Sequence, residues 1–431
     1  MSEWKEYKLS DLVTKLGDGL HGTPKYDPNG DYYFINGSNL INGKISVNEN
    51  TKKVTKEEFE KHKKVLTNRT IFVSINGTLG NIALYNDEKV VLGKSACYFN
   101  IKDDVSKEFI KYIVTDHSFQ HYIYEYATGS TIKNVPLKAI RDYTFKIPDL
   151  PTQTAIAEIL SSLDDKIELN NKINQELENL AQTLFKQWFI DFEFPNENGE
   201  PYKSSGGEMV DSELGEIPEG WEVGYLEDVI EFHNGYAFTS KELESANSSE
   251  SYHVFKMGHI KKGGGLNAEG TKSYFSKSKT LKLSKYVLKK GDLLMCMTDM
   301  KGNVALLGHT ALMNEDDKYI VNQRVGLLRP KNDVGIDYPY LYILTNSFDF
   351  IEELRSRANS GVQVNLSTNE IKKSKILIAP KSINEQFDLI TKSFYDKIFE
   401  ITNENETLRN TRDFLLPKLI SGELEINEIS K

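Results

Sequence analysis

The sequence contains an internal duplication with a period of roughly 220 residues. Three pairs of segments match in the same order along the chain, and the offset between them grows only slightly. The pairs are 4–13 with 221–230, 71–84 with 293–306, and 127–134 with 358–365. Solenoid repeats are much shorter, at about 20–50 residues, so this period predicts two copies of one domain. The alternative is chance similarity between two α/β segments.

Each copy has a globular part followed by a long helix. In the globular parts, short apolar runs are bounded by Gly and Asn turns, which indicates mixed strands and short helices of an α+β fold. Pro, Gly, Ser and acidic residues between the copies indicate a linker. The predicted parts are a first globular domain at 1–150, a helix at 151–190, the linker at 191–220, a second globular domain at 221–380, and a second helix with its tail at 381–431.

Both long helices carry an apolar stripe with heptad spacing. Apolar residues recur at steps of four and three from Ile156 to Trp188 and from Phe387 to Leu408, and Pro417 is expected to end the second helix. Asn170 and Asn174 interrupt the first stripe, and Lys397 and Glu404 interrupt the second. Such stripes pair helix against helix, so we expect a two-helix coiled coil. The alternative is that each helix packs on its own globular part.

Charge is distributed unevenly along the chain. The whole chain has a net charge of −10, yet 1–150 holds 21 basic and 19 acidic residues and 223–380 holds 21 and 18. The acidity lies in 151–222, with 16 acidic and 4 basic residues. Seven lysines and no acidic residue lie between Thr271 and Lys290, a composition that suits phosphate contacts. A plain solvated face is the alternative.

The sequence has no recognisable catalytic signature. Gly93-Lys94-Ser95 ends like a phosphate-binding loop, but Glu88 stands where the first glycine is required. Zinc-protease, nucleophile-elbow and Cys-x-x-Cys motifs are missing, as is the Asn/Asp-Pro-Pro-aromatic tetrapeptide of amino-methyltransferases. We therefore expect a binding or scaffolding protein with no catalytic residue and no metal site.

The expected cellular compartment follows from three further features that the sequence lacks. There is no stretch of about 20 apolar residues that could span a membrane and no signal-peptide layout. Two cysteines, Cys97 and Cys296, give no disulfide framework. A cytoplasmic protein is expected.

Three stretches closely resemble the specificity subunit of type I restriction-modification enzymes, and the similarity extends over essentially the full length. They are 150–167 (LPTQTAIAEILSSLDDKI), 207–221 (GEMVDSELGEIPEGW) and 415–424 (LLPKLISGEL). The resemblance implies two target recognition domains in a pseudo-twofold repeat, separated by two long helices that form an antiparallel coiled coil.

The resemblance also implies the function and the partners. Each domain would read one half of a split double-stranded DNA sequence, without catalysis by this chain. The expected partners are two modification (methyltransferase) subunits and restriction/translocase subunits. The chain itself would hold no cofactor, since S-adenosylmethionine, ATP and Mg would belong to those partners.

The length of the helices would determine the distance between the two halves of such a split target. A helix over 152–190 would span roughly 58 Å at 1.5 Å per residue, and DNA advances about 34–36 Å per turn. If the helices pair antiparallel, they would set the number of unread base pairs.

Base-reading residues are expected to be polar or aromatic groups on loops. By position in the repeat, the candidates in the first domain are His21, Thr23, Lys25, Tyr26, Ser38, Asn39, Asn76, Thr78, Lys133 and Asn134. In the second domain they are Tyr236, Phe238, Lys241, His259, Lys261, Lys262, Thr298, Lys301, Gln363 and Asn365, with Gln323-Arg324 in addition. Because the paired loops differ in side chains, we expect an asymmetric target. Turn residues are often polar for structural reasons alone, which is the alternative for each.

An aromatic run closes the first helix and has two interpretations. Phe185, Trp188, Phe189 and Phe192 carry more apolar surface than a two-helix seam covers, so we expect a docking face for a modification subunit. The alternative is that they pack under the second domain.

Two other functions compete with DNA reading. One is a coiled-coil interaction scaffold whose globular domains bind proteins rather than DNA. The other is a methyltransferase in its own right, which the missing tetrapeptide disfavours.

Overall fold

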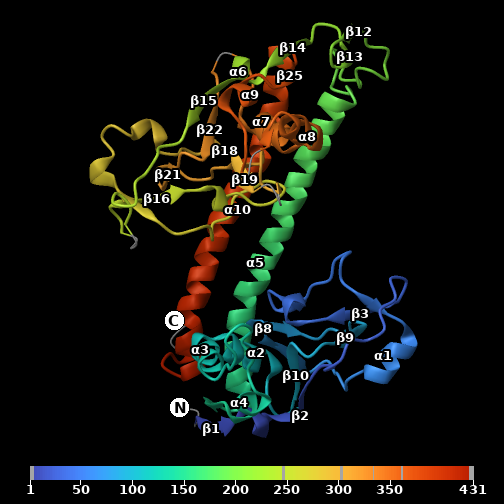
Figure 1. Cartoon of the computed structure of the whole chain (residues 1–431), viewed down its shortest axis with the longest axis vertical. Helices are drawn as coiled ribbons and strands as arrows, with labels where there is room; N and C mark the ends of the chain where they lie inside the picture. The colour runs from blue at the N-terminus through green and yellow to red at the C-terminus, as the bar shows by residue number, and fades with distance from the viewer. Residues whose placement is uncertain (1–3, 245–247, 301–303, 333, 361–362, 427–431) are drawn as a thin grey trace. The chain divides into compact units, whose positions relative to one another are not determined.

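The computed structural model describes residues 4–244, 248–300, 304–332, 334–360 and 363–426. The chain divides into two compact units. Unit 1 comprises Met1–Asn170 and Glu404–Lys431, and unit 2 comprises Asn171–Asn403. Figure 1 colours the chain from its N-terminus in blue to its C-terminus in red. Both long helices contribute to both units, so unit 1 is discontinuous in sequence where we predicted contiguous domains.

The described residues of unit 1 form four small sheets and four short helices. Its strands are β1 (Lys5–Lys8), β2 (Val13–Asp18), β3 (Tyr32–Ile35), β4 (Leu40–Ile41), β5 (Lys44–Ile45), β6 (Lys53–Val54), β7 (Thr70–Asn76), β8 (Thr78–Leu84), β9 (Val90–Leu92), β10 (Ala96–Ile101) and β11 (Thr144–Ile147). Its helices are α1 (Lys56–His62), α2 (Lys107–Thr115), α3 (His117–Glu125) and α4 (Leu137–Asp142), with 3-10 turns η1 (Leu9–Leu12) and η2 (Gly37–Asn39). The sheet orders are β1-β11, β2-β10-β7-β8, β6-β3-β9 and β4-β5.

Unit 2 is built from a similar set of elements. Its strands are β12 (Met209–Ser212), β13 (Gly215–Pro218), β14 (Glu222–Tyr225), β15 (Ile230–Asn234), β16 (Ser251–Phe255), β17 (Tyr274–Ser276), β18 (Leu293–Cys296), β19 (Thr298–Met300), β20 (Thr310–Leu312), β21 (Tyr319–Val321), β22 (Val325–Pro330), β23 (Asn359–Ser360), β24 (Gln363–Asn365) and β25 (Lys375–Ile378). Its helices are α6 (Leu226–Val229), α7 (Tyr338–Asn346), α8 (Phe348–Ser356) and α9 (Thr368–Lys372), with 3-10 turns η4 (Met257–His259), η5 (Lys277–Lys279) and η6 (Ser284–Tyr286). The sheet orders are β12-β13, β14-β25, β15-β22-β18-β20, β17-β16-β21 and β19-β24-β23.

The two units share one topology, which confirms the predicted duplication. The pair β1-β11 corresponds to β14-β25, and β2-β10-β7-β8 corresponds to β15-β22-β18-β20. In the third sheet, the central strand of each unit pairs in parallel on one side and antiparallel on the other, as β3 does with β9 and β6, and β16 with β21 and β17. The chain therefore contains two copies of one α+β fold.

One detail of the predicted alignment is wrong. We matched Leu84 to Leu306, but Leu84 pairs with Ile71, and the residue that pairs with the corresponding Leu293 is Leu312. The segment between the paired strands is longer in unit 2 and contains residues similar to those of β8. Matching these residues by their letters placed the alignment six residues too early.

The two long helices are α5 (Leu150–Phe185), followed by a π-helical turn η3 (Lys186–Ile190), and α10 (Lys381–Ser421). Pro417 lies inside α10 and does not end it, contrary to our prediction. Leu416, Leu419 and Ile420 around it are buried in the core of unit 1, and this packing offsets the hydrogen bond that proline cannot donate. The helix ends at Gly422, which has a positive φ of 77°.

In unit 1 the ends of α5 and α10 pack against each other in antiparallel order. Asn170 donates to Asn405 Oδ1 at 2.9 Å, and six residues earlier Asp164 accepts from Arg412 Nη1 at 2.8 Å. Residue numbers therefore fall along α5 in the direction in which they rise along α10, as in an antiparallel pair. Leu160 lies in the same core as Leu416 and Leu419.

In unit 2 the remaining sections of the helices also pack together. The ring of Phe387 in α10 packs edge-to-face on Phe189 at 5.0 Å and at a tilt on Trp188 at 5.8 Å between ring centroids. The first predicted stripe is confirmed, since Ile156, Leu160, Ile167, Ala181 and Trp188 are all buried.

The second predicted stripe is partly wrong. Its buried positions continue from Phe387 through Thr391, Tyr395, Ile398 and Asn405, whereas Lys397 and Glu404 are exposed. Thr391 satisfies its hydroxyl by donating to the carbonyl oxygen of Phe387 at 2.8 Å. A polar side chain can therefore occupy the buried face of this helix. A prediction that follows only apolar residues does not detect such a position.

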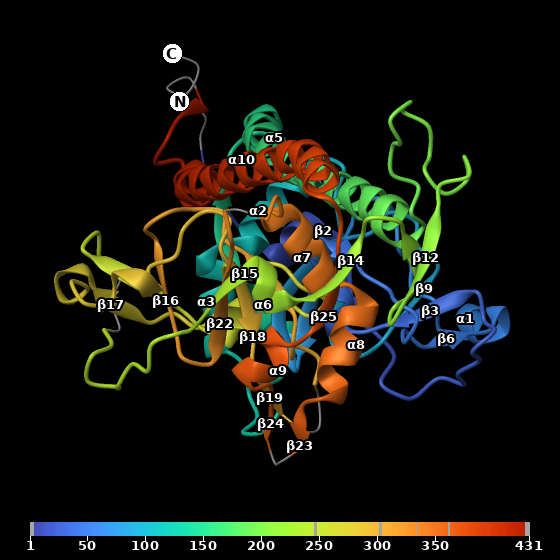
Figure 2. The ribbon, with the colours of Figure 1, turned by 90° about the horizontal axis from the view of Figure 1, so that it is seen from above.

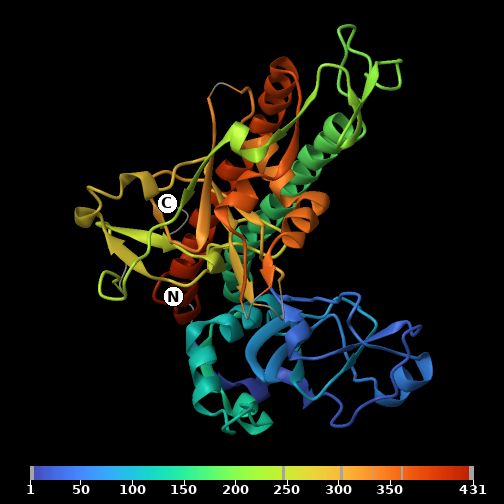
Figure 3. The same ribbon diagram turned by 45° about the horizontal axis from the view of Figure 1, so that its top comes forward.

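The aromatic run does not form an exposed face. Phe185, Trp188, Phe189 and Phe192 are at most 8% exposed and belong to the core of unit 2. The predicted linker shares this core, because its residues Phe194 and Ile217 are buried there, beside Trp221 of the predicted second domain. Figure 3 shows the light-green β12-β13 hairpin extending from this segment. The structure therefore corresponds to the alternative interpretation, packing under the second domain.

No helix among the described residues is long and apolar enough to cross a membrane.

Candidate nucleic-acid interface

In unit 1 two of the predicted loops meet at the turn between β7 and β8. Asn76 Nδ2 donates to Asn134 Oδ1 at 3.1 Å, and the Gly77 amide donates to the Lys133 carbonyl oxygen at 3.1 Å. Asn134 and Thr128 exchange two backbone hydrogen bonds of 2.8 and 2.9 Å. Thr78, Lys133 and Asn134 are exposed, so these loops form one polar surface.

A third segment, Gly93–Ser95 between β9 and β10, lies beside this pair of loops. The amides of Ile75 and Asn76 donate to the Ser95 carbonyl oxygen at 2.8 and 3.3 Å, and the Lys94 amide donates to that of Leu20 at 3.1 Å. Lys94 is exposed, and our candidate residues omitted it. Its place in the repeat beside Gln323-Arg324 was the signal that could have identified it.

Unit 2 contains the same arrangement. Thr298 pairs with Asn365 across β19 and β24, and the Thr298 hydroxyl donates to Asn365 Oδ1 at 2.9 Å. Figure 2 shows β19, β24 and β23 at the edge of unit 2 farthest from α10. Gln363 and Asn365 are exposed, whereas Thr298 is buried. The candidate Lys301 lies outside the described residues.

The segment Asn322–Arg324 of unit 2 takes the place of Gly93–Ser95. The Gln323 amide donates to the Tyr236 carbonyl oxygen at 2.9 Å, and the Met297 amide donates to that of Arg324 at 3.3 Å. Gln323 and Arg324 are both exposed. Each unit therefore brings a strand end, a hairpin turn and two loops together at one place.

The other candidates of unit 1 surround this surface. His21 Nε2 lies 2.6 Å from Asp18 Oδ2, and Lys52 Nζ lies 4.4 Å from the ring centroid of Tyr26. His21, Thr23, Lys25, Tyr26 and Ser38 are exposed. Asn39 instead supports the backbone, since its Oδ1 accepts from the Asn36 amide at 2.9 Å.

His259 is the counterpart of Asn39 and does not reach the surface. Its Nδ1 accepts from the Lys256 amide at 3.0 Å, and its side chain is fully buried. Burial, together with the nearby His253, lowers the pKa of His259 to about 4. A buried neutral ring offers no contact to a base, so in this conformation His259 organises the turn.

The remaining candidates of unit 2 lie on a partly aromatic surface. The rings of Tyr236 and Phe238 are half-buried and pack at 4.9 Å, and Phe238 contacts Phe275 at 5.0 Å. Lys241, Lys261 and Lys262 are exposed.

The lysine run of unit 2 is less free than the sequence indicates. Acidic residues from elsewhere in the chain pair with Lys277 and Lys290, at 3.0 Å from Asp317 and 2.8 Å from Asp396. Within the described part of the chain, Lys282, Lys285 and Lys289 have no ion pair and are exposed. These three remain for phosphate contacts.

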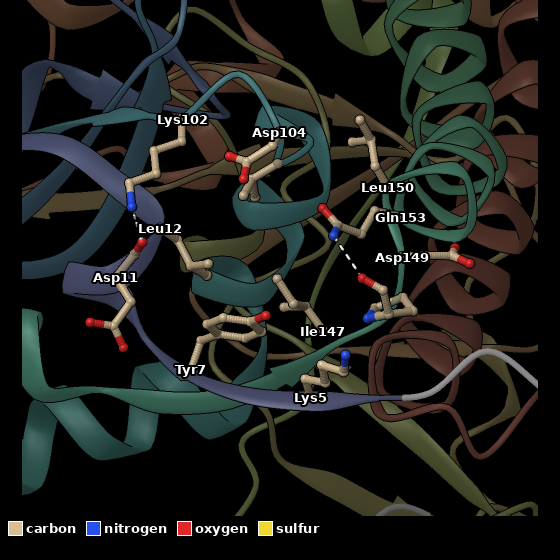
Figure 4. Close-up of a pocket in the computed structure, with 12 residues that line it drawn as sticks. Lys5, Tyr7, Asp11, Leu12, Lys102, Asp104, Ile147, Asp149, Leu150 and Gln153 are labelled. Carbon is tan, nitrogen blue, oxygen red and sulfur yellow. Dashed lines mark hydrogen bonds between the residues drawn. The ribbon is translucent and has the colours of Figure 1, made fainter.

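A polar pocket lies elsewhere in unit 1, at the start of α5 (Figure 4). Gln153 closes it by donating to the Pro148 carbonyl oxygen at 2.8 Å and accepting from the Ser106 amide at 2.9 Å. Lys102 Nζ donates to the Asp11 carbonyl oxygen at 2.6 Å. None of the loops described above lines this pocket, and Gln153 and Lys102 use their polar groups to join neighbouring segments of unit 1.

Comparison with known proteins gives a consistent family. The family model described as type I restriction modification DNA specificity domain matches residues 1–179 and 218–409. The chain is 25% identical to the type I restriction enzyme MjaIX specificity subunit of Methanocaldococcus jannaschii over 99% of this chain and 95% of that protein. It is 24% identical to the HindI specificity subunit of Haemophilus influenzae over 98% of this chain and all of that protein.

A solved structure agrees on the fold. The crystal structure of the type I restriction-modification S subunit from M. genitalium superposes with a TM-score of 0.56 at 19% identity, covering 97% of this chain and 96% of that one. Together with the family match over both repeats, this shows that the chain belongs to the family of type I restriction-modification DNA specificity subunits.

Proposed function

We propose that this chain is the DNA-reading, non-catalytic subunit of a type I restriction-modification complex, and that each unit reads one half of an asymmetric, bipartite target. The observation that carries the proposal is the loop cluster built twice on one topology with different side chains. Asn76 in unit 1 stands where Thr298 stands in unit 2, and Lys94 stands where Gln323 stands. Two units with the same backbone fold but different polar side chains in their loops are suited to reading two different DNA half-sites.

Charge on the two units supports a DNA partner. The globular parts are slightly basic, although the chain as a whole is acidic. Exposed Lys241, Lys261 and Lys262, together with Lys282, Lys285 and Lys289, can contact phosphates in unit 2. A scaffold whose domains bind only proteins has no need for this pattern.

Partner subunits would supply the chemistry. Two modification subunits would bind S-adenosylmethionine and methylate, and restriction/translocase subunits would use ATP and Mg to translocate and cleave. The long helices, shared by both units, would provide the scaffold for these partners.

A domain exchange tests the proposal. Residues 1–150 are replaced by the corresponding region of another specificity subunit, and the complex is expressed with its modification subunit in a host without other methylation. Sequencing of methylated positions should show that one half of the motif changes and the other half stays. The reciprocal exchange of 221–380 should change the opposite half, and a motif unaffected by either exchange would rule the proposal out.

A further inference from the structure

We propose that the two turns Gly93–Ser95 and Asn322–Arg324 are base-reading elements, with Lys94 contacting guanine in one half-site and Gln323 contacting adenine in the other. The inference rests on the proposed function and assigns bases to two positions of that site.

Backbone hydrogen bonds hold each turn on both sides. In unit 1 the Gly93 amide donates to the Ile35 carbonyl oxygen at 2.8 Å, while the Lys94 amide reaches that of Leu20. In unit 2 the Asn322 amide donates to the Phe255 carbonyl oxygen at 2.9 Å and the Gln323 amide to that of Tyr236. A side chain on such a turn starts from a fixed backbone, which lowers the entropy cost of contacting a base.

A glycine in each unit allows the turn to come this close. A Cβ on Gly19 would lie 2.2 Å from the Gly93 carbonyl oxygen, and one on Gly235 would lie 2.1 Å from that of Asn322. Any other residue at either position would push the turn away from the strand end. Both repeats therefore meet the same steric requirement at the same point of the fold.

Lys94 and Gln323 are among the groups that remain available in their clusters. Both are exposed, and neither side chain has a hydrogen bond or ion pair with any described residue. Their neighbours are engaged, since Asn76 holds Asn134 and Thr298 holds Asn365. Ser95 is also engaged, because its Oγ accepts from the Gly37 amide at 2.8 Å and donates to Asn36.

The side-chain chemistry selects the bases. A lysine ammonium donates to the O6 and N7 acceptors that guanine presents in the major groove, and a glutamine amide matches the N6 donor and N7 acceptor of adenine. Arg324 is exposed where unit 1 has the engaged Ser95, and it adds a cation to the second turn only. The two turns therefore read different bases from equivalent positions.

The test uses the full chain in complex with its modification subunit and compares four single variants, Lys94→Ala, Lys89→Ala, Gln323→Ala and Asn332→Ala. Lys89 and Asn332 are exposed controls of similar character that lie beyond the opposite ends of β9 and β22. Methylated positions are sequenced, and binding is measured on duplexes with each base substituted in turn. Lys94→Ala should weaken the preference for guanine at one position of one half-site by roughly 10-fold or more, and Gln323→Ala should do the same for adenine in the other half.

Unchanged motifs in both Lys94→Ala and Gln323→Ala would overturn the assignment. A loss of binding that is equal for every base substitution in these two variants would also overturn it, because it would indicate phosphate contact only. The domain exchange described above remains a separate readout. If it changes half of the motif while the point variants do not, this inference fails and the proposed function stands. If it changes nothing, both fail.

Discussion

Single residues show how the two repeats build one turn with different chemistry. Asn39 and His259 occupy equivalent places, and each accepts a hydrogen bond from the amide three residues earlier. The histidine ring is enclosed by His253, Phe255 and Tyr319 at 4.9 to 6.1 Å between centroids. Unit 2 has therefore placed a titratable group where unit 1 has a neutral amide.

This difference predicts an acid-sensitive unit 2. The pKa of His259 is about 4, below its usual 6.5, and that of His253 is also lowered by burial and by Lys272 and Lys318. Because the unfolded chain binds protons first, stability is full above pH 6.5 and falls as pH drops toward 4, by about 3 kcal/mol for His259 alone. His259→Asn, copying unit 1, should flatten the pH dependence of unfolding measured between pH 4 and 7. The exposed His121→Asn should leave the slope as it is.

Contacts between elements are concentrated at Asp164 of α5. Its carboxylate accepts from Lys111 at 2.9 Å, Tyr112 at 2.7 Å and Arg412 at 2.8 Å, joining α2, α5 and α10 within unit 1. Burial opposes ionisation, but the charge of Lys111 and the hydrogen bonds outweigh it, so the pKa of Asp164 is lowered.

Asp164→Ala should therefore destabilise unit 1 by about 2 kcal/mol, because charge-assisted hydrogen bonds from Lys111, Tyr112 and Arg412 are lost, although Arg412 still pairs with Asp413. The stabilisation from Asp164 is present above the usual carboxyl pKa and is lost as pH falls below it. Chemical denaturation at pH 7 measures the effect. The neighbouring, exposed Asp165→Ala should change stability by less than about 0.5 kcal/mol, and an equal loss in both variants would contradict the assignment.

The polar layer in the helix pair gives a second prediction for these elements. Asn170 is 1% exposed and donates to Glu404 at 2.8 Å and to Asn405 at 2.9 Å. Asn170→Ala should cost about 1–3 kcal/mol, because the buried amide of Asn405 loses this hydrogen bond and Glu404 loses its own. The double variant Asn170→Leu/Asn405→Leu should recover part of that loss, since apolar residues can replace a buried polar pair. A double-mutant cycle in denaturant measures the coupling, and strictly additive losses would show that the two amides act independently.

At the scale of the whole molecule, the first unit depends on the last segment of the chain. Leu416, Leu419 and Ile420 are buried in the same core as Phe109 and Leu160, although about 250 residues separate them from the rest of that core in sequence. Unit 1 is therefore complete only when the C-terminal part of α10 is present.

Leu419→Ala should accordingly destabilise residues 1–170 by about 2–5 kcal/mol, the usual cost of a cavity in a packed core. Hydrogen exchange of the full chain would show faster exchange in 1–170 and little change in 223–380. Leu389→Ala on the same helix removes a side chain that is 77% exposed and should have almost no effect. Faster exchange confined to the second globular part would contradict the discontinuous unit.

The duplication, the α+β class, the two long helices and the first apolar stripe could all be predicted from the sequence, because they depend on local periodicity and on residues repeated in the same order. The sequence also placed Asn76 with Asn134 and Thr298 with Asn365 among the candidates, since both pairs recur at equivalent positions. Three other features became visible only in the folded chain: α10 continues past Pro417, the aromatic side chains between Phe185 and Phe192 are buried, and His259 faces inward. Each of these depends on which distant surface covers a side chain. Lys94 was missed because its backbone hydrogen bond to Leu20 forms only when the strands are assembled.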